Sequence, residues 1–278
     1  MRRIGTVGAF KKVSPWIVPV AIVLLWQLLS DLRLLSATIL PAPLAVAKAA
    51  LQLAESGLIF HHIGLSAQRA LIGFAIGGSI GFALGLINGT SRFAENMLDT
   101  TVQMLRNIPH LALIPLVIAW FGIQEEAKVF LVALGVFFPI YVNTFHGVRT
   151  VDKGLIEMAK VYGLRGWGLF RQVILPGAMS SILVGVRYSL GVMWISLIVA
   201  ETIASDAGIG YLAMNAREFM QMDVVVLSII LYALLGKLSD VIAKLLENRL
   251  LQWHPNYRKS SVVRRKRWGK RQLSLNKP

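Results

Sequence analysis

Few polar side chains could do chemistry in this strongly apolar chain, and Glu201 is the most prominent of them. It lies near the end of an apolar segment, where a carboxylate could carry a proton or line a pathway across a membrane. It could equally lie at the membrane interface, held by Thr202 or by a neighbouring backbone group. Arg106, beside Asn107, and Arg187 could attract an anion, although basic residues are also common near cytoplasmic span ends. We treat Glu201, Arg106 and Asn107 as possible pathway residues.

The patterns of cofactor-binding and metal-binding proteins do not occur in the sequence. The chain has no cysteine, which excludes a disulfide framework and a thiolate metal site. A helix would splay the adjacent pair His61 and His62 apart, which disfavours a metal site there. The phosphate loop Gly-x4-Gly-Lys-Ser/Thr does not occur at Gly236-Lys237, because Leu238 follows. We therefore expect no cofactor or metal on this chain, and any ATP with its Mg²⁺ would be bound by another chain.

Composition indicates a bundle of helices in lipid. Of the 278 residues, 55% are hydrophobic and 15% charged, and the mean hydropathy is +0.63. Soluble domains have about 45–50% apolar and about 25% charged residues. The net charge of +15 would suit nucleic-acid binding, but nine lysines and arginines and no acid lie in residues 255–278. We interpret that tail as a solvated or lipid-facing terminus, and we expect no nucleic-acid partner.

Six segments approach the roughly 20 mainly apolar residues that cross a bilayer. They are residues 16–29, 70–87, 102–121, 129–148, 182–204 and 224–246. No small-x-small cleavage site closely follows the first, so we expect it to be retained. Pro109 and Pro115 in the third segment and Pro139 in the fourth predict irregular helices. The expected fold class is all-α, a polytopic membrane bundle of six transmembrane helices.

Basic residues predict the orientation. Six spans place both termini on one side, and without the last 24 residues that side carries eleven lysines and arginines against five opposite. The positive-inside rule makes both termini cytoplasmic. The expected organisation is an N-tail (1–15), a first span with an outside segment (16–69), a five-helix core (70–246) with a loop at 149–181, and a basic tail (247–278).

The outside segment should contain a short helix at residues 44–56 that ends at Gly57. One face of this helix carries Leu44, Ala47, Leu51 and Ala54 at helical spacing. Such a face would lie on the bilayer or on the bundle.

Glycines recur at every fourth position of the second span. They are Gly73, Gly77, Gly81, Gly85 and Gly89. Each would weaken a helix on which nothing packs, and together they leave a groove that allows close backbone approach, the main source of helix association in lipid. The row predicts a helix-packing face.

The cytoplasmic loop 149–181 carries two apolar patterns at helical spacing. The first comprises Leu155, Met158, Ala159 and Tyr162 and predicts a helix that ends at Gly163. The second comprises Leu169, Phe170, Val173 and Ile174 and predicts a helix closed by Pro176. Two apolar faces exposed to the cytoplasm would need a cover, which indicates docking with a soluble partner.

Within this loop, Glu157, Ala159 and Gly163, followed by Leu175-Pro176, resemble the EAA loop of ABC importer permeases. Met158 replaces the usual alanine and Val173 stands where isoleucine is commoner, and both keep an apolar side chain. In that family the loop forms a coupling helix in a cleft of the nucleotide-binding subunit. Residues 103–109, 119–122, 198–202 and 208–212 resemble the sulfonate, taurine and nitrate permease group, and residues 213–219 its aliphatic sulfonate branch.

The resemblance implies a type I, binding-protein-dependent importer permease of the bacterial cytoplasmic membrane. Its expected partners are the bilayer, a second copy of the chain, a dimer of ATP-binding subunits and an extracytoplasmic binding protein. Alkanesulfonates are the implied cargo, and taurine, nitrate, another small organic anion or a pyrimidine precursor are alternatives. A passive channel would not need the 157–176 pattern, and an intramembrane enzyme is the most distant alternative.

Overall fold

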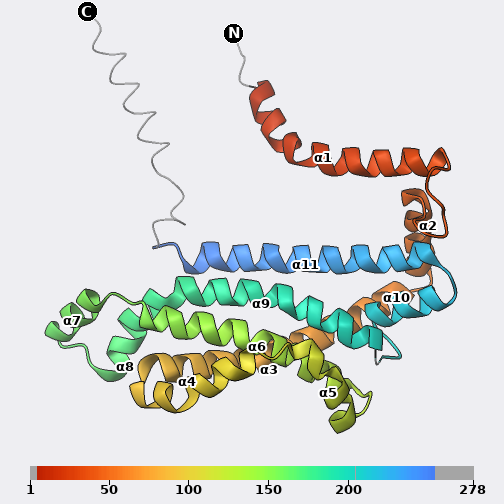
Figure 1. Cartoon of the computed structure of the whole chain (residues 1–278). Helices are drawn as coiled ribbons and strands as arrows, with labels where there is room; N and C mark the ends of the chain where they lie inside the picture. The colour runs from red at the N-terminus through yellow and green to blue at the C-terminus, as the bar shows by residue number, and fades with distance from the viewer. Residues whose placement is uncertain (1–4, 204, 254–278) are drawn as a thin grey trace, which may run out of the picture. The chain divides into compact units, whose positions relative to one another are not determined.

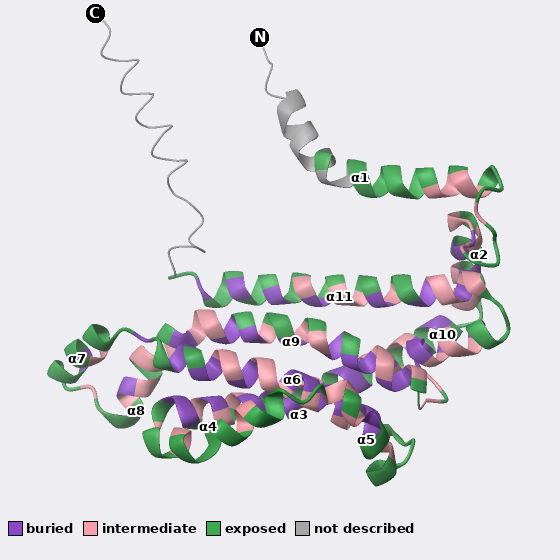
Figure 2. Ribbon diagram, in the orientation of Figure 1, coloured by how far each residue is buried: buried purple, intermediate pink, exposed green. Residues whose placement is uncertain are grey.

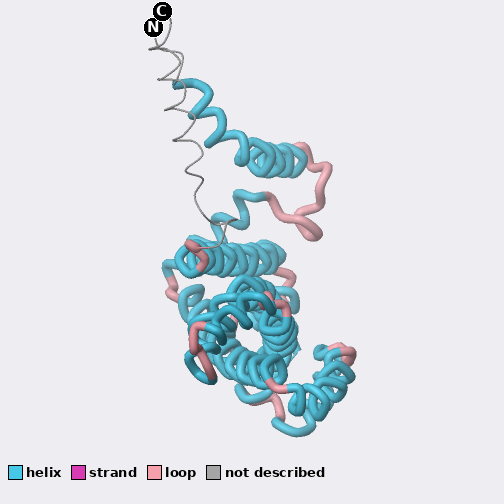
Figure 3. Tube along the Cα trace, turned by 90° about the vertical axis from the view of Figure 1, so that its left-hand side faces the viewer, coloured by secondary structure: helices cyan, strands magenta, loops and turns pink. Residues whose placement is uncertain are grey.

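The computed structural model describes residues 5–203 and 205–253, in which all regular structure is helical (Figures 1 and 3). The helices are α1 (Gly5–Asp31), α2 (Pro43–Glu55), α3 (Leu58–Thr90), α4 (Arg92–Arg106), η1 (His110–Leu113), α5 (Ile114–Phe121), α6 (Glu125–Arg149), α7 (Lys153–Val161), α8 (Gly166–Leu169), the π-helical η2 (Phe170–Ile174), α9 (Leu175–Ile203), α10 (Ile209–Glu218) and α11 (Met222–Leu250). The first four residues, Ala204 and residues 254–278, which include the basic tail, lie outside the described residues.

Four helical runs in the described ranges are long and apolar enough to cross a membrane. They are α3, α6, the run Gly166–Ile203 and α11. The predicted third span is two helices rather than one, because α4 and the segment His110–Phe121 are bent by 81°. Counting that pair as one span gives five. The apolar part of α1, Ile17–Asp31, is shorter than the other candidates.

The prolines explain where these helices break. Pro109 directly precedes η1 and has no N–H to continue α4. Pro115 lies in the first turn of α5, just after the break, and the predicted irregularity of the third span is confirmed by the 81° bend. A missing N–H costs little there, since first-turn donors have no partner within the helix. Pro139 does lie inside a helix, in the middle of α6.

The chain forms two compact units that alternate along the sequence. The first comprises Met1–Ala75, Pro109–Leu134 and Val192–Gly236, and the second Ile76–Ile108, Gly135–Gly191 and Lys237–Pro278. Helices α3, α6, α9 and α11 each contribute to both units. Every contact discussed below lies within one of them.

Small apolar clusters form the core of the first unit. Ile114 and Val117 of α5 pack with Ala127 and Leu131 of α6 and Ala200 of α9. A second cluster joins α2, α10 and the start of α11 through Ala49, Leu212, Ala216 and Val224. A third joins α2, α3 and α11 through Val46, Ile59 and Leu227. Figure 2 shows the buried residues concentrated where these helices meet.

Helix α2 confirms the predicted short helix before Gly57. Ser56 caps it and Gly57 follows with φ +76°, which suits glycine. Val46 and Ala49 are buried, whereas Leu44 and Leu51 are 61% and 64% exposed. Of the two interpretations of the Leu44 face, packing on the bundle is therefore excluded, and contact with the bilayer stays a prediction.

The core of the second unit lies around the end of α6. Val148 and Val151 pack with Ala178 and Ile182 near the start of α9. Phe82 and Leu86 of α3, Ile156 of α7 and the segment Val173, Ile174 and Leu175 pack around this cluster. The second half of the loop 149–181 is thereby packed against the core of the second unit.

Candidate functional site

Helix α7 has a well-defined beginning and end. Asp152 caps its N-terminus, accepting a 2.7 Å hydrogen bond from the Gly154 N–H. At the other end the Gly163 N–H donates to the Lys160 carbonyl and the Leu164 N–H to the Ala159 carbonyl, both at 3.0 Å. This pair of bonds is a Schellman motif, in which the residue at the Gly163 position adopts positive φ, here +86°. The four-residue spacing from Ala159 to Gly163 thus has a local backbone cause.

The outward face of this helix and the turn that follows is apolar. Leu155 and Met158 are half exposed, and Val161, Tyr162 and Trp167 are 86%, 79% and 71% exposed. Ala159 is buried, and Glu157 is exposed. We call Leu155, Met158, Val161, Tyr162 and Trp167 the α7 surface.

The sequence pattern predicted an exposed apolar face on the second half of the loop. The structure does not show one. Leu169 is buried, and Val173, Ile174 and Leu175 pack against the cluster around Val148 and Ile182. The prediction of two uncovered faces is therefore wrong, and the α7 surface is the exposed one of the two.

Pro176 does not close a helix either. Helical structure runs without interruption from Gly166 to Ile203, and Pro176 lies in the first turn of α9. The five residues before α9 form a π-helix, in which the Leu175 N–H donates to the Phe170 carbonyl. A π turn is one of the ways in which a helix absorbs a local disruption such as a proline.

A second site, in the first unit, is a buried cluster around Glu201. The Glu201 side chain has no exposed surface. Its carboxylate accepts hydrogen bonds from Ser66 Oγ at 2.8 Å, from Arg69 Nη1 at 2.8 Å, from the Gly210 N–H at 2.9 Å and from Tyr232 Oη at 2.9 Å. Neighbouring backbone therefore holds Glu201, as one interpretation expected. Thr202 does not, because its hydroxyl donates to the Val199 carbonyl.

This carboxylate also organises the start of α10. The Gly208 N–H donates to His62 Nδ1, the Ile209 N–H to Ser66 Oγ and the Gly210 N–H to Glu201. These N–H groups would otherwise lack partners, and a helix N-terminus favours negative charge. A Cβ on Gly208 would lie 2.5 Å from Glu201 Cδ, and Gly208 also has φ +118°. Glycine is required there so that the backbone can approach the carboxylate.

Arg69 links the cluster to a second carboxylate. Its Nε and Nη2 donate to the two oxygens of Glu125 at 2.5 and 2.6 Å, and its Nη1 also bonds Ser205 Oγ and the Ala207 carbonyl. Glu125 further accepts a 2.8 Å bond from Lys128, whose side chain is only 2% exposed. Each buried cation therefore has an acidic partner, as burial of charge requires.

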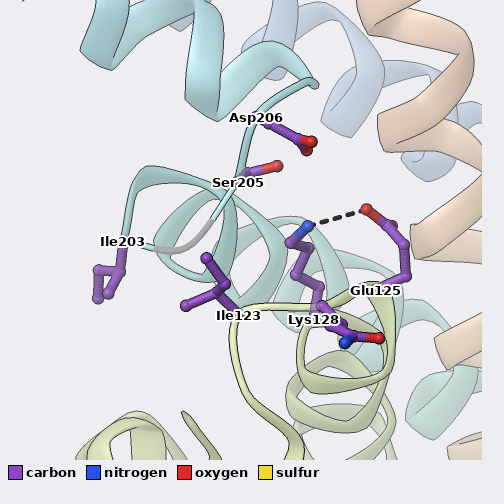
Figure 4. A pocket seen from close by; sticks show the side chains of 7 residues that line it. Ile123, Glu125, Lys128, Ile203, Ser205 and Asp206 are labelled. Atoms are coloured by element: carbon purple, nitrogen blue, oxygen red, sulfur yellow. Dashed lines mark hydrogen bonds and ion pairs between the residues drawn. The ribbon is translucent and has the colours of Figure 1, made fainter.

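A hollow of about 530 Å³ lies beside this cluster (Figure 4). Its lining combines polar groups with two isoleucines: Ile123, Gln124, Glu125, Lys128, Ile203, Ser205 and Asp206. Figure 4 shows the Lys128 ammonium directed at Glu125. The volume is that of a small-molecule pocket, but the ammonium is already paired and Asp206 adds negative charge.

Sequence reasoning missed most of this cluster. Arg69 and Lys128 were counted as outside basic residues, yet both are buried within helices. The available signals were the pairs Ser66/Arg69 and Glu125/Lys128, each three residues apart at the end of an apolar helix. Such polar pairs share one face of a helix.

Helix α6 closely approaches the glycine row of α3. A Cβ added to Gly73 would lie 2.6 Å from Val132 Cγ1, and one on Gly81 would lie 2.5 Å from the Phe137 carbonyl oxygen. A Cβ added to Gly85 would lie 2.8 Å from Thr144 Cβ, and one added to Gly89 would lie 2.7 Å from Val148 Cβ. Gly77 is buried. Residues 77–81 also have Gly-x-Ser-x-Gly spacing, but they lie inside α3 rather than in the strand-to-helix turn of a hydrolase.

The remaining candidates lie in the second unit, Arg106 and Asn107 at a helix end and Arg187 inside α9. Arg106 and Asn107 are exposed at the end of α4, where Asn107 is the C-cap residue. Arg187 forms a 2.7 Å ion pair with Asp240, which also pairs with Lys244 at 2.8 Å and Lys237 at 3.6 Å. Both lysines lie on α11 with Asp240, three residues before it and four residues after it.

No group of three or more potential metal ligands occurs in the part of the chain that the structure describes. His62 accepts a backbone hydrogen bond, and its ring centroid lies 5.8 Å from that of His61. His110 lies in η1 and pairs with the buried Ser196 at 2.8 Å.

Comparison with known proteins places the chain among transport proteins. It is 63% identical over 246 residues, 88% of this chain and 94% of the other, to an Escherichia coli K12 protein named as the aliphatic sulfonates transport permease SsuC. It is 44% identical over 241 residues, 87% of each chain, to a Bacillus subtilis 168 protein of the same name. A crystal structure of an amino acid ABC transporter with histidines has the same fold, with a TM-score of 0.60 over 72% of this chain and 97% of that one, at 18% identity. Residues 73–252, which include α7, α9 and α11, match one family, and the chain belongs to it: the inner membrane components of binding-protein-dependent transport systems.

Proposed function

We propose that this chain forms the membrane pathway of an ATP-driven importer of aliphatic sulfonates. The proposed cargo is supported by one observation: the chain is 63% identical, over 88% of its length, to a permease named for aliphatic sulfonates. The chain is a transport subunit and not an enzyme, as its family membership and its relatives establish. Its described helices are those of a multi-pass membrane protein.

The proposed assembly has two copies of this chain, two ATP-binding subunits and one extracytoplasmic binding protein. Six spans would place both termini in the cytoplasm of a bacterium, with α1 as the first span and the bent α4–α5 pair as the third. ATP and Mg²⁺ would be held by the ATP-binding subunits. The expected organisation into a 1–15 tail, a 16–69 segment, a 70–246 core and a 247–278 tail belongs to this proposal.

The α7 surface is the proposed contact with the ATP-binding subunit. Its five exposed apolar side chains need a cover in water, and a short amphipathic helix such as the nine-residue α7 fits a groove on a partner. Glu157 and Met158 would touch the partner directly. Ala159 and Gly163 would set the end of the helix, and Val173, Leu175 and Pro176 would fix it to the bundle.

In the pathway we propose roles for Arg106 and Asn107, which are exposed at the end of α4. Glu201 is not suited to a pathway role, because its carboxylate is buried and accepts hydrogen bonds from four groups. A carboxylate also repels a sulfonate. We propose that Glu201 holds the start of α10 and is kept from direct contact with the cargo.

Uptake by a reconstituted transporter tests both parts of the proposal. Proteoliposomes with this chain, its ATP-binding subunit and its binding protein should accumulate radiolabelled ethanesulfonate only when ATP is supplied to the ATP-binding side. Gly163→Val should reduce uptake roughly five- to thirty-fold, since positive φ costs a side chain about 1–2 kcal/mol. Gly163→Asn is the matched control and should retain most of the uptake, because asparagine tolerates this conformation.

The two variants isolate the backbone effect. Apart from the adjacent residues, no atom lies within 4 Å of a Cβ placed on Gly163, so the two variants differ in how well they tolerate positive φ and not in contacts with other elements. Full uptake by Gly163→Val would contradict the coupling role. ATP-driven uptake of taurine or nitrate without ethanesulfonate would leave coupling intact and overturn the cargo.

A further inference from the structure

Three basic side chains share one carboxylate where α9 and α11 meet in the second unit. Asp240 Oδ1 accepts hydrogen bonds from Arg187 Nε at 3.0 Å and Nη2 at 2.7 Å. Asp240 Oδ2 accepts a 2.8 Å bond from Lys244 Nζ and lies 3.6 Å from Lys237 Nζ. We call Arg187, Lys237 and Lys244 the basic triad.

The triad carries more positive charge than its partners neutralise. The only other acid paired with it, among the residues that the structure describes, is Glu247, whose Oε2 lies 3.7 Å from Arg187 Nη1. Three cations therefore face two carboxylates, and one of these contacts is long. The side chains of Lys237 and Lys244 are 68% and 47% exposed, so their ammonium groups have room for another acceptor.

Uncharged runs of equal length separate the charges of each helix. In α9 the 13 residues 188–200 between Arg187 and Glu201 carry no Asp, Glu, Lys or Arg. In α11 the 13 residues 224–236 between Asp223 and Lys237 carry none either. Thirteen helical residues span about 20 Å, which is two thirds of the roughly 30 Å hydrocarbon layer. Long basic side chains at that depth extend toward the nearer headgroups.

The surroundings of the triad are apolar and exposed. Val184 and Tyr188 of α9 are 52% and 64% exposed, and Leu238, Val241 and Leu245 of α11 are 54%, 41% and 57% exposed. Figure 2 shows exposed residues recurring along α11. In a membrane protein such a surface faces acyl chains, so a ligand here would need an anionic head and an apolar body.

We propose that the basic triad binds the phosphate of an anionic phospholipid. The phosphate oxygens accept from Lys237, Lys244 and Arg187 Nη1, whose 3.7 Å contact with Glu247 is long, and the acyl chains lie on Tyr188, Leu238 and Leu245. Basic clusters between membrane helices suit such headgroups. The orientation proposed above makes this a lipid of the cytoplasmic leaflet, but the binding itself does not depend on transport or cargo.

Native mass spectrometry can count the bound lipid. The full chain, purified with its ATP-binding subunit in a neutral detergent, is titrated with phosphatidylglycerol, phosphatidylcholine, inorganic phosphate or ethanesulfonate. The expected result is a saturable phosphatidylglycerol adduct per chain that phosphatidylcholine does not compete away. In the double variant Lys237→Gln/Lys244→Gln, phosphatidylglycerol should bind roughly 25-fold more weakly, since each basic residue contributes about 1 kcal/mol.

Two further variants make the result specific. The double variant keeps the Arg187–Asp240 pair that joins the helices, so the fold should survive. Asp240→Asn removes the competing carboxylate and should strengthen phosphatidylglycerol binding, which loss of a merely structural ion pair would not do. Lys153→Gln/Lys160→Gln removes two exposed lysines of α7 and should leave binding unchanged.

Three outcomes would overturn the proposal. Equal phosphatidylglycerol binding by the wild type and the triad variant would show that the lysines are not ligands. An equal loss in the α7 control would show a general field effect. Lysine-dependent binding of phosphate or ethanesulfonate without preference for phosphatidylglycerol would identify a site for soluble anions instead.

Discussion

Glu201 is a carboxylate that only its partners make tolerable inside the protein. Ser66, Arg69, Gly210 and Tyr232 all donate to it, and its side chain has no exposed surface. Removing one partner of a buried ion pair leaves the other uncompensated, at a cost of about 3–5 kcal/mol. We expect Glu201→Ala to lower the thermal unfolding temperature of the purified protein and the yield of monodisperse material.

Glu201→Gln should be milder than the alanine change. Its amide oxygen can still accept from the Gly210 N–H, while Arg69 keeps both bonds to Glu125. Glu126→Gln, at an exposed acid next to Glu125, is the matched control and should change stability by less than about 0.5 kcal/mol. Thermal unfolding temperatures that rank alanine no worse than the control would mean that the Glu201 cluster is not holding the fold.

At the scale of the residue, sequence could single out Glu201 but not its partners. Ser66 is 135 positions away, and its proximity follows from how α3 and α9 pack. No spacing in the sequence encodes that packing. The end of α7, by contrast, could be predicted, because a left-handed glycine stops a helix through bonds made within six residues.

At the scale of the element, local chemistry predicted the helices better than their exposed faces. The short helix before Gly57 and the helix before Gly163 were both expected and found. Tertiary packing decides which stripe of a helix is covered. The expectation of a second exposed face in the loop was wrong, because Val173 and Ile174 pack inward. On α2 the same effect selects between two interpretations, since Val46 rather than Leu44 faces the core. Pro176 was predicted to close a helix. It does not, because a π turn precedes it and the helical run continues to Ile203.

The close approach of α3 and α6 predicts position-dependent effects of adding one methyl group. On Gly81 that group would lie 2.5 Å from the Phe137 carbonyl oxygen, an atom of the backbone that cannot turn aside. Gly81→Ala should therefore push the helices apart and destabilise the protein by about 1–3 kcal/mol, measured as a fall in thermal unfolding temperature in detergent.

Gly64 offers the matched control within the same helix. No atom lies within 4 Å of a Cβ placed there, and alanine favours a helix over glycine by up to about 1 kcal/mol. Gly64→Ala should leave the unfolding temperature unchanged or raise it. If both variants behaved alike, the contact with α6 would not constrain α3.

At the scale of the whole molecule, helix lengths in the described residues give four candidate spans, or five with the bent pair. Four helical runs pass a length and composition test, a fifth candidate is bent by 81°, and the apolar part of α1 is short. The proposed topology therefore depends on the distribution of basic residues.

The absence of cysteine from the chain makes that topology directly testable. Single cysteines at four exposed positions, Ser14→Cys, Gln124→Cys, Lys160→Cys and Arg249→Cys, introduce unique labelling sites. In intact spheroplasts a membrane-impermeant maleimide should label Gln124→Cys alone, and after permeabilisation it should label all four. Labelling of Lys160→Cys but not Gln124→Cys would reverse the orientation. Opposite labelling of Ser14→Cys and Arg249→Cys would mean an odd number of spans, because an even number returns the chain to the side on which it began.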